Sequence, residues 1–340
     1  MTSVSQNFHK NIKLPLVEKY RPKLFNDLLF DDFIREKIKS IITSGQIPNM
    51  IITGEPSTGK TSTVLYLAKK IYKENYSEHV LELNASDDRG LAMIRETILP
   101  FCKKKTSNYK IVILDEADSI TPKAQNLLNN IIAEFKETTR FVFICNEGFK
   151  IGESIQSRCM ILYFPRISKK NLKKKIKDIC INENIEYNDD GIIQLLFCSN
   201  FDIRQCINNL ECILYTYGSL TVETVDNIID IPKIHLLKQI IIECYNKNLS
   251  TVLKITKQLY DSGYSANDII LTFMKYIENG DDEEEFLIKC YVDVYKILSQ
   301  SFIKINLIDN MVQLSACIVS IYKLILSNNL KEHQENIKLL

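Results

Sequence analysis

The first half of the sequence predicts an α/β domain built on a five-stranded parallel sheet, and the second half predicts helices only. Short apolar, β-branched runs alternate with amphipathic stretches as far as residue 164. This alternation is typical of a parallel sheet that helices cover on both faces. A glycine-containing loop follows the first apolar run and opens the first amphipathic stretch, which is typical of nucleotide-binding α/β domains.

The predicted strands and helices of this domain follow one another in a regular order. Thr121 is expected to cap the third helix, with Pro122 at the first helical position, where its missing N–H has no intrahelical partner to lose. Strands are predicted at residues 50–53, 80–83, 110–114, 140–145 and 160–164, and helices at residues 60–73, 91–104 and 122–136.

The strand pattern stops after Phe164-Pro165-Arg166. Four amphipathic stretches then predict a small helical domain, and Ile231-Pro232 begins a third region that is helical to its end. The acidic run at residues 281–285 is expected to form a solvated loop. The four helices of the small domain are predicted at residues 168–183, 190–197, 202–215 and 222–229, and the three domains at residues 1–165, 166–230 and 231–340.

Composition and charge restrict the classes of function. Of the 340 residues, 45% are hydrophobic and 25% are charged, which is ordinary for a folded soluble protein. The formal net charge is only +1. A protein that binds nucleic acid alone usually carries a strong basic excess, so we expect any DNA contact to be local or shared among several subunits.

The ten cysteines are scattered, mostly within apolar runs, and form no CxxC pair. Such cysteines behave as small buried hydrophobic residues, and this usage fits a reducing compartment without a zinc site. No stretch has the apolar core of a signal peptide or of a membrane span, so we expect no membrane association.

The segment at residues 54–61, GEPSTGKT, matches GxxxxGK[ST] between a predicted strand and a predicted helix. Backbone N–H groups of such a loop and of the helix N-terminus cradle phosphates. Lys60 would reach the β- and γ-phosphate oxygens, and the Thr61 hydroxyl would hold Mg²⁺. A chance match rarely occurs in this setting, so the segment predicts a phosphate-binding loop.

Polar residues also follow the third and fourth predicted strands. Asp115 would hold Mg²⁺, directly or through its waters, and Glu116 would polarise an attacking water. Two acids at a strand end often only begin a loop, but we expect this strand to neighbour that of the phosphate loop. Asn146 ends the next strand, where it would orient the water; taken alone, it would more often be a turn residue.

Two arginines are candidates for contacts with a γ-phosphate. Arg158 precedes the fifth predicted strand, and Arg204 begins a helix of the second domain. Arg158 would serve a neighbouring subunit, whereas Arg204 would act within its own chain. The alternative for each is an ordinary surface charge.

Two segments resemble sequence boxes of a known family. Residues 14–22, LPLVEKYRP, resemble the N-terminal signature of replication factor C small subunits, and residues 81–90, LELNASDDRG, match another box of that family. With the GxxxxGKT, DEAD, SRC and IRQ elements in order, the resemblance covers about residues 14–230. Residues 263–265 and 268–270 are similar to the small subunit that human nomenclature numbers second.

The resemblance implies an AAA+ P-loop domain, a helical lid and an all-α collar that joins subunits. It implies a nuclear, heteropentameric ATPase that uses ATP and Mg²⁺ to open a ring-shaped sliding clamp and load it onto primer–template DNA in replication and repair. A second reading is a structural ring subunit that binds ATP and donates an arginine finger but hydrolyses little. A related AAA+ motor forming homomeric rings is a third reading.

The resemblance also implies roles for single residues. Glu116 would be the catalytic base, Asn146 the first sensor, Arg204 the second sensor on the lid, and Arg158 the finger that completes a neighbour's site. The implied metal ligands are Thr61 and Asp115. The implied nucleotide-binding residues are Glu18, Tyr20, Arg21 and Pro22 near the adenine, and Gly54, Glu55, Pro56, Ser57, Thr58, Gly59, Lys60, Thr61, Ser62, Asn146 and Arg204 around the phosphates.

The sequence departs from the family pattern in two places. Glu55 and Ser57 replace a proline and a glycine of the usual GPPGTGK loop, and a carboxylate beside a polyphosphate is unfavourable unless it points outward. Asn129-Asn130 stand where related subunits carry an Arg-Arg pair. The GxxxxGKT frame survives, so we still expect ATP binding.

Contacts with DNA and with the clamp are expected on and after the second helix. Arg89, Arg95 and the lysines at residues 103–105 would follow DNA phosphates, although a solvated loop explains the lysines equally well. Ile98 and Phe101 are expected to face the clamp, because the corresponding segment does so in the family.

Overall fold

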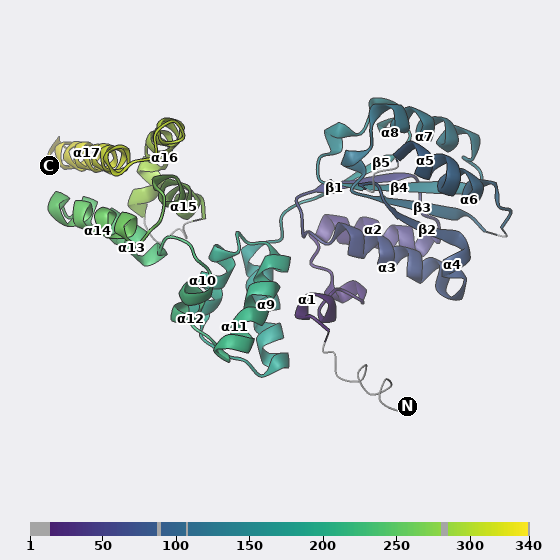
Figure 1. Ribbon diagram of the computed structural model, residues 1–340, viewed down its shortest axis with the longest axis horizontal. Coiled ribbons are helices and arrows are strands. Elements are labelled where there is room, and N and C mark those ends of the chain that lie inside the picture. The colour runs from purple at the N-terminus through teal and green to yellow at the C-terminus, as the bar shows by residue number, and fades with distance from the viewer. Residues whose placement is uncertain (1–13, 87–89, 107, 280–284, 339–340) are drawn as a thin grey trace, which may run out of the picture. The chain divides into compact units, whose positions relative to one another are not determined.

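A computed structural model describes residues 14–86, 90–106, 108–279 and 285–338 (Figure 1). The chain forms two compact units, of which the first ends at Thr221 and the second begins at Val222. The first unit contains the sheet and the helices that follow it as far as residue 216, and the elements described in the second unit are helices. The three-domain boundaries predicted at residues 165/166 and 230/231 stay predictions.

A five-stranded parallel sheet lies at the centre of the first unit and confirms the predicted fold class. Its strand order is β2-β3-β4-β1-β5. The expectation that the strand before Asp115 neighbours that of the phosphate loop is wrong, because β4 lies between β1 and β3 and pairs with both. The strands are β1 (Met50–Gly54), β2 (Val80–Asn84), β3 (Lys110–Asp115), β4 (Thr139–Cys145) and β5 (Met160–Phe164).

The two faces of the sheet are packed in separate cores. Successive residues of β1 alternate between them: Met50 and Ile52 pack in one core and Ile51 in the other. Both faces are covered, which explains why the strands read as continuous apolar runs. Helices α2, α3 and α4 lie along one face, and α5, α6, α7 and α8 along the other (Figure 1). Their bounds are α2 (Asp32–Ser44), α3 (Lys60–Tyr72), α4 (Tyr76–His79), α5 (Gly90–Met93), α6 (Leu99–Lys103), α7 (Pro122–Glu134) and α8 (Glu153–Gln156).

Short helical turns connect these elements. Helix α1 (Leu16–Lys19) precedes the sheet, and the 3-10 turns are η1 (Phe25–Asp27), η2 (Lys73–Asn75), η4 (Ala117–Ser119) and η5 (Gly148–Lys150). The predicted helix at residues 91–104 is a continuous run of α5, a π-helical turn η3 (Ile94–Ile98) and α6. The π turn ends two residues before Pro100, whose ring clashes with the carbonyl four residues earlier in a regular α-helix.

Three helices of the first unit follow the sheet at the predicted positions. Each begins after a side chain that accepts a hydrogen bond from a free N–H of its first turn: Ser168, Asn188 and Asp202. A small two-stranded parallel sheet beside them was not predicted. These elements are α9 (Lys169–Glu183), β6 (Glu186–Tyr187), α10 (Asp189–Cys198), α11 (Ile203–Thr216) and β7 (Ser219–Leu220).

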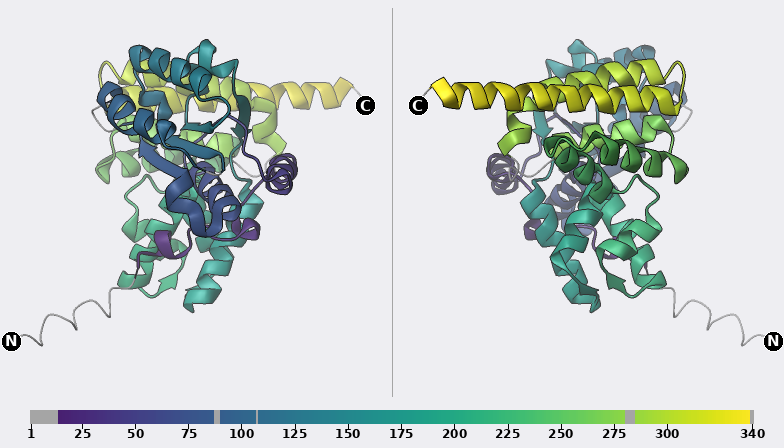
Figure 2. Two further views of the ribbon diagram at one scale, coloured as in Figure 1. Left: turned by 90° about the vertical axis from the view of Figure 1, so that its right-hand side faces the viewer. Right: turned by 90° about the vertical axis from the view of Figure 1, so that its left-hand side faces the viewer.

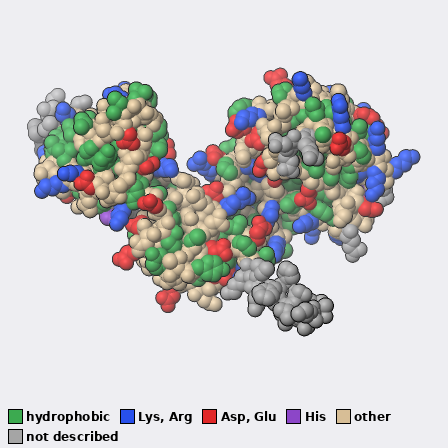
Figure 3. Space-filling model, in the orientation of Figure 1, with side chains coloured by type: hydrophobic (Ala, Val, Ile, Leu, Met, Phe, Trp, Pro, Cys, Tyr) green, Lys and Arg blue, Asp and Glu red, His purple; other side chains and the backbone are tan. Residues whose placement is uncertain are grey.

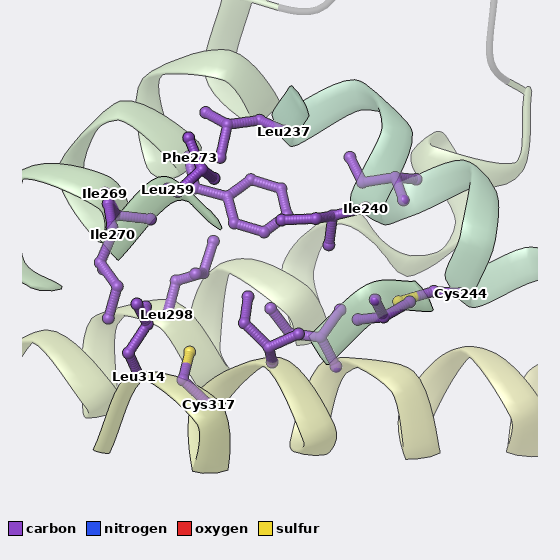
Figure 4. Close-up of a cluster of buried hydrophobic side chains, with 14 of the residues drawn as sticks. Leu237, Ile240, Cys244, Leu259, Ile269, Ile270, Phe273, Leu298, Leu314 and Cys317 are labelled. Carbon is purple, nitrogen blue, oxygen red and sulfur yellow. The ribbon is translucent and has the colours of Figure 1, made fainter. Parts of the chain in front are cut away.

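The helices of the second unit from Ile234 onward pack around one apolar core. Figure 4 shows Phe273 at the centre of this core, among Leu237, Leu259 and Ile240. Helix α16 runs beside the long helix α17, which is yellow in Figure 2. The helices are α12 (Val222–Ile228), α13 (Ile234–Tyr245), α14 (Leu249–Asp261), α15 (Ala266–Asn279), α16 (Glu285–Ile305) and α17 (Met311–Lys338).

Candidate nucleotide-binding site

The predicted phosphate-binding loop joins β1 to α3, and two glycines allow its path. Gly54 has φ +147°, and a Cβ atom there would lie 2.1 Å from the Phe164 carbonyl oxygen, so a larger residue does not fit without a backbone shift. Gly59 has φ +86° and is the residue before α3. The loop therefore delivers the chain to the N-terminus of α3, where unpaired N–H groups favour an anion.

Lys60 is buried at this helix start, with only 7% of its surface exposed. Its Nζ donates hydrogen bonds to the carbonyl oxygens of Gly54 and Glu55, at 2.8 and 2.7 Å, and to Oδ1 of Asn146 at 2.9 Å. Burial lowers the pKa of Lys60 from its ordinary value. Among the described residues, no carboxylate lies within ion-pair distance of Nζ. A buried ammonium group without a carboxylate partner fits the phosphates of a nucleotide.

Thr61 and Asp115 lie in contact, although they come from different elements. The Thr61 hydroxyl donates to Oδ2 of Asp115 at 2.9 Å. Hard oxygen ligands of this kind suit Mg²⁺, which usually takes one or two protein ligands and completes its shell with phosphates and waters. The pair therefore fits a Mg²⁺ that arrives with a nucleotide.

Glu116 follows directly and is exposed. Its backbone is left-handed, with φ +52°, and its N–H donates to Oδ1 of Asp115 at 2.9 Å. Non-glycine residues adopt this conformation rarely, and such outliers cluster at functional sites. The turn presents the Glu116 side chain to solvent immediately beside the candidate metal ligand.

Asn146 lies between these groups because β4 separates β1 from β3. Its Oδ1 accepts from Lys60, and its carbonyl oxygen accepts from the Thr53 hydroxyl at 3.1 Å. Oδ2 of Asp118 accepts from the backbone N–H groups of Asn146 and Glu147, at 3.1 and 3.3 Å. Asp118 thus fixes the turn that carries Asn146. Asp118 was not predicted as a site residue, although it is the last residue of the DEAD segment.

A cavity beside the loop brings together residues that are far apart in the sequence. Among the predicted nucleotide-binding residues, Glu18, Tyr20, Arg21 and Pro22 line it together with Ser57, Thr58, Gly59, Ser62 and Arg204. Its remaining walls were not predicted. They are formed by Val17, Asp27, Leu28, Leu29, Ile167, Lys175, Ile203 and Ile207. A mostly apolar wall with a few polar groups is typical of a small-molecule site and suits a purine ring.

The segment around α1 is held on the helices of residues 169–216. The backbone N–H of Leu16 donates to Oε2 of Glu211 at 3.2 Å, and both Lys19 and the Tyr20 hydroxyl donate to Oε1 of Glu183. Burial, followed by the hydrogen bond to Glu183, raises the pKa of Tyr20, so the phenol stays protonated. These contacts explain how a segment before the sheet becomes a wall of the cavity.

The two candidate arginines occupy different environments. Arg204 lies at the start of α11 and lines the cavity. Arg158 does not line it: this residue is exposed between α8 and β5, and its Nη1 donates to the Ser154 carbonyl oxygen at 2.8 Å. Arg204 can therefore reach a ligand in the cavity of its own chain, whereas Arg158 is accessible to another molecule.

The residues that depart from the family pattern lie in different local environments. The Glu55 carboxylate lies 3.3 Å from Nη2 of Arg166 in an exposed ion pair, so it has a cationic partner. Asn130 is exposed on α7, and Asn129 is half-buried with no partner for its Oδ1 among the described residues.

The candidate DNA-binding and clamp-binding residues differ in their exposure to solvent. Ile98 is fully buried in the core beneath α5–α8, so the expectation that it faces a partner is wrong. Phe101 is half-buried, whereas Arg95 is exposed, as are the lysines at residues 103–105; Arg89 lies outside the described residues. Acidic and basic side chains are interspersed over the visible face of the first unit (Figure 3), in keeping with the net charge of +1.

The strand order, the phosphate loop and the acids at the end of β3 define a P-loop nucleotide-binding domain of the AAA class. Residues 50–166 match the family described as "ATPase family associated with various cellular activities (AAA)", and residues 232–320 match the "Replication factor C C-terminal domain". The Holliday junction branch migration motor RuvB of Thermotoga maritima shares the fold, with a TM-score of 0.51 and 15% identity over 65% of this chain and 79% of that chain.

Sequence identity to curated proteins shows the family to which the chain belongs. The chain is 39% identical to a probable replication factor C subunit 2 of Dictyostelium discoideum over 80% of this chain and 82% of that protein. It is 36% identical to replication factor C subunit 4 of Schizosaccharomyces pombe, over 81% of each, and 36% identical to the human subunit 5, over 79% and 80%. The chain therefore belongs to the family of replication factor C small subunits. Among the described residues, no helix is long and apolar enough to cross a membrane.

Proposed function

We propose that this chain is an ATP-hydrolysing small subunit of a sliding-clamp loader, which helps to open the clamp and load it onto primer–template DNA in the nucleus during replication and repair. Family membership supports the biological role. The observation that carries the ATPase activity is the buried Lys60 ammonium group, which has no carboxylate partner among the described residues and donates to Asn146.

Each residue of the site has a step in the proposed reaction. Lys60 binds the β- and γ-phosphate oxygens of ATP and neutralises their charge. Thr61 and Asp115 hold Mg²⁺, which when bound stabilises negative charge on the phosphates. Asn146, whose backbone Asp118 fixes, orients the attacking water. Glu116 accepts a proton from that water as the general base.

The two arginines act on the transferred phosphate from different chains. Arg204, at the start of α11, contacts the γ-phosphate in its own cavity. Arg158 is exposed and completes the site of a neighbouring subunit, where such arginines increase the rate by about 10³- to 10⁵-fold. Because Arg158 acts in the site of another subunit, the proposal requires a ring of subunits. We propose that this ring is a heteropentamer. The low net charge fits DNA binding that several subunits share.

The ATPase is tested by replacing Lys60 with alanine in the assembled complex. Because several charge-assisted hydrogen bonds are lost, ATP affinity at this subunit should fall on the order of 100-fold. Lys70→Ala is the matched control, because Lys70 is an exposed lysine of the same helix. Titration with a fluorescent ATP analogue measures both, and equal affinities of the two variants would contradict the proposal.

A second candidate is a structural subunit that binds ATP and donates Arg158 but hydrolyses little itself. The replacements Glu55 and Ser57 in the phosphate loop and Asn129-Asn130 on α7 favour it. Turnover of the assembled ring with Glu116→Gln or Arg158→Ala separates the two. The catalytic proposal expects both variants to lower turnover. If only Arg158→Ala does so, the structural subunit is correct. The native mass and composition of the purified complex test the heteropentamer, and a homomeric ring would contradict it.

A further inference from the structure

Ser57 of the phosphate loop is tied to the helix that carries Arg204. Its hydroxyl donates a hydrogen bond to Oδ2 of Asp202 at 2.9 Å, across 145 positions of sequence. Asp202 is the residue before α11, and both side chains are half-buried. The contact therefore joins the loop that is proposed to hold the phosphates to the helix that carries a proposed phosphate ligand.

The backbone at Ser57 suits glycine better than serine. Its φ is +60°, a left-handed conformation that residues with a Cβ adopt only at an energetic cost. The usual loop of the family has glycine here, which would occupy this conformation without strain. Serine therefore bears the strain of the left-handed backbone, and the hydrogen bond to Asp202 is what its hydroxyl adds.

Asp202 uses its two oxygens for two different contacts. Oδ1 accepts from the backbone N–H groups of Arg204 and Gln205, at 2.8 and 3.2 Å, and so caps α11. Oδ2 accepts from Ser57. One carboxylate thus fixes the first turn of α11 and connects that turn to the phosphate loop. Because Arg204 lies in this turn, the position of its backbone depends on the same carboxylate.

We propose that Ser57 is a positioning residue, which acts through Asp202 to hold the first turn of α11, and with it Arg204, over the nucleotide. This inference rests on the proposed ATP site. Both partners of this hydrogen bond belong to the chain, so part of the ordering of this helix over the site does not depend on the nucleotide. Preorganisation of this kind raises affinity because less ordering remains to be done on binding.

The first test compares Ser57→Ala with Ser57→Gly in the full chain within its complex. Both variants lose the hydroxyl, but only glycine relieves the backbone. Loss of one hydrogen bond should weaken ATP binding about 3- to 10-fold in both variants, whereas Ser57→Gly should melt at a higher temperature than Ser57→Ala. If Ser57→Gly binds ATP as the wild type does, the hydroxyl has no positioning role and the proposal is wrong.

The second test asks whether Ser57 acts through Asp202 and Arg204. Asp202→Ser keeps a capping hydroxyl for α11 but shortens the side chain that reaches the loop. Combined with Ser57→Ala, it should weaken ATP binding no further than either change alone. In an Arg204→Ala background, Ser57→Ala should have less than about a 2-fold effect, since the residue it positions is gone. Additive losses in either combination would overturn the proposal.

A third measurement separates this inference from the proposed function. Without nucleotide, amide hydrogen exchange of residues 202–206 should be faster in Ser57→Gly than in the wild type, because the first turn of α11 has lost its tie. Unchanged exchange overturns the tie even if the wild type binds ATP. Faster exchange supports it even if the wild type binds none, and in that case it is the ATPase proposal that fails.

Discussion

The two units of the chain bury different kinds of side chain. Among the described residues, the core of the first unit includes Lys60, His79, Lys110 and Gln125, whereas the buried polar residues of the second are two threonines. Both of those hydroxyls donate to a carbonyl oxygen of their own helix. The lysines and Gln125 of the first unit instead donate to carbonyl oxygens of loops and helix ends.

This difference shows where the fold requires side chains at exact positions. An apolar core tolerates many side chains of suitable volume, whereas a buried polar group must meet a partner at one place. The second unit is accordingly a scaffold whose stability follows its packing. In the first unit, buried polar groups hold loops and helix ends, and the loop that Lys60 contacts is part of the proposed catalytic site. Substitutions in the two units should therefore have different consequences.

The largest expected effect on stability is that of Phe273→Ala in the second unit. Phe273 is fully buried at the centre of the core in Figure 4, and the cavity left behind should lower the free energy of unfolding by about 3–5 kcal/mol. ATP affinity should stay unchanged. Calorimetry and nucleotide titration measure the two quantities, with the partly exposed Leu271→Ala on the same helix as a control. A parallel loss of ATP affinity would break the contrast between the units.

An intermediate effect is expected for Lys110→Met in the first unit. Nζ of Lys110, which is 1% exposed, donates to the carbonyl oxygens of Phe101 and Cys102, at 2.8 and 2.6 Å, and to that of Lys104. Methionine has a similar volume but leaves these carbonyls unpaired, so the free energy of unfolding should fall by about 1–3 kcal/mol. Chemical denaturation measures it. An equal loss in Lys103→Met, an exposed position of α6, would show that the carbonyl contacts are not the cause.

The smallest expected effect is that of Glu55→Gln in the phosphate loop. The ion pair with Arg166 is exposed, so its loss should change the free energy of unfolding by less than about 1 kcal/mol. Removal of a negative charge near bound phosphates should strengthen ATP binding about 2-fold at low salt and less at high salt. Titrations at two ionic strengths measure this change, and weaker binding would indicate that Glu55 supports the loop.

The elements that the sequence predicted well are those with local signals. Continuous apolar runs marked all five strands, and Thr121 and Pro122 marked the start of α7, although the Thr121 side chain makes no capping hydrogen bond there. Helix α2 was missed although Asp31 caps its start and Gly45, with φ +68°, ends it. The place of β4 between β1 and β3 could not be read from the chain order, because tertiary packing decides which strands pair.

In the site, too, residues within local sequence motifs could be predicted, whereas residues that the fold brings in from far along the chain could not. The phosphate loop and its acids carry their own patterns, and the structure brings Lys60, Thr61, Asp115 and Asn146 into one network. Lys175 was missed because nothing near it in the sequence shows that α9 borders the cavity. Ile98 was assigned outward by analogy alone, yet the spacing of four residues from Ile94 to Ile98 to Cys102, all buried, matches one helix face.

The anchoring of α1 also sets an order of events during synthesis. Tyr20 and Leu16 leave the ribosome early, but their partners Glu183 and Glu211 are made more than 160 residues later. Domains generally fold as units in the order in which they are synthesised, and contacts so far apart in the chain form late. A nascent chain that has completed its sheet therefore still lacks one wall of the nucleotide cavity. The cavity is completed only when α9 and α11 have emerged.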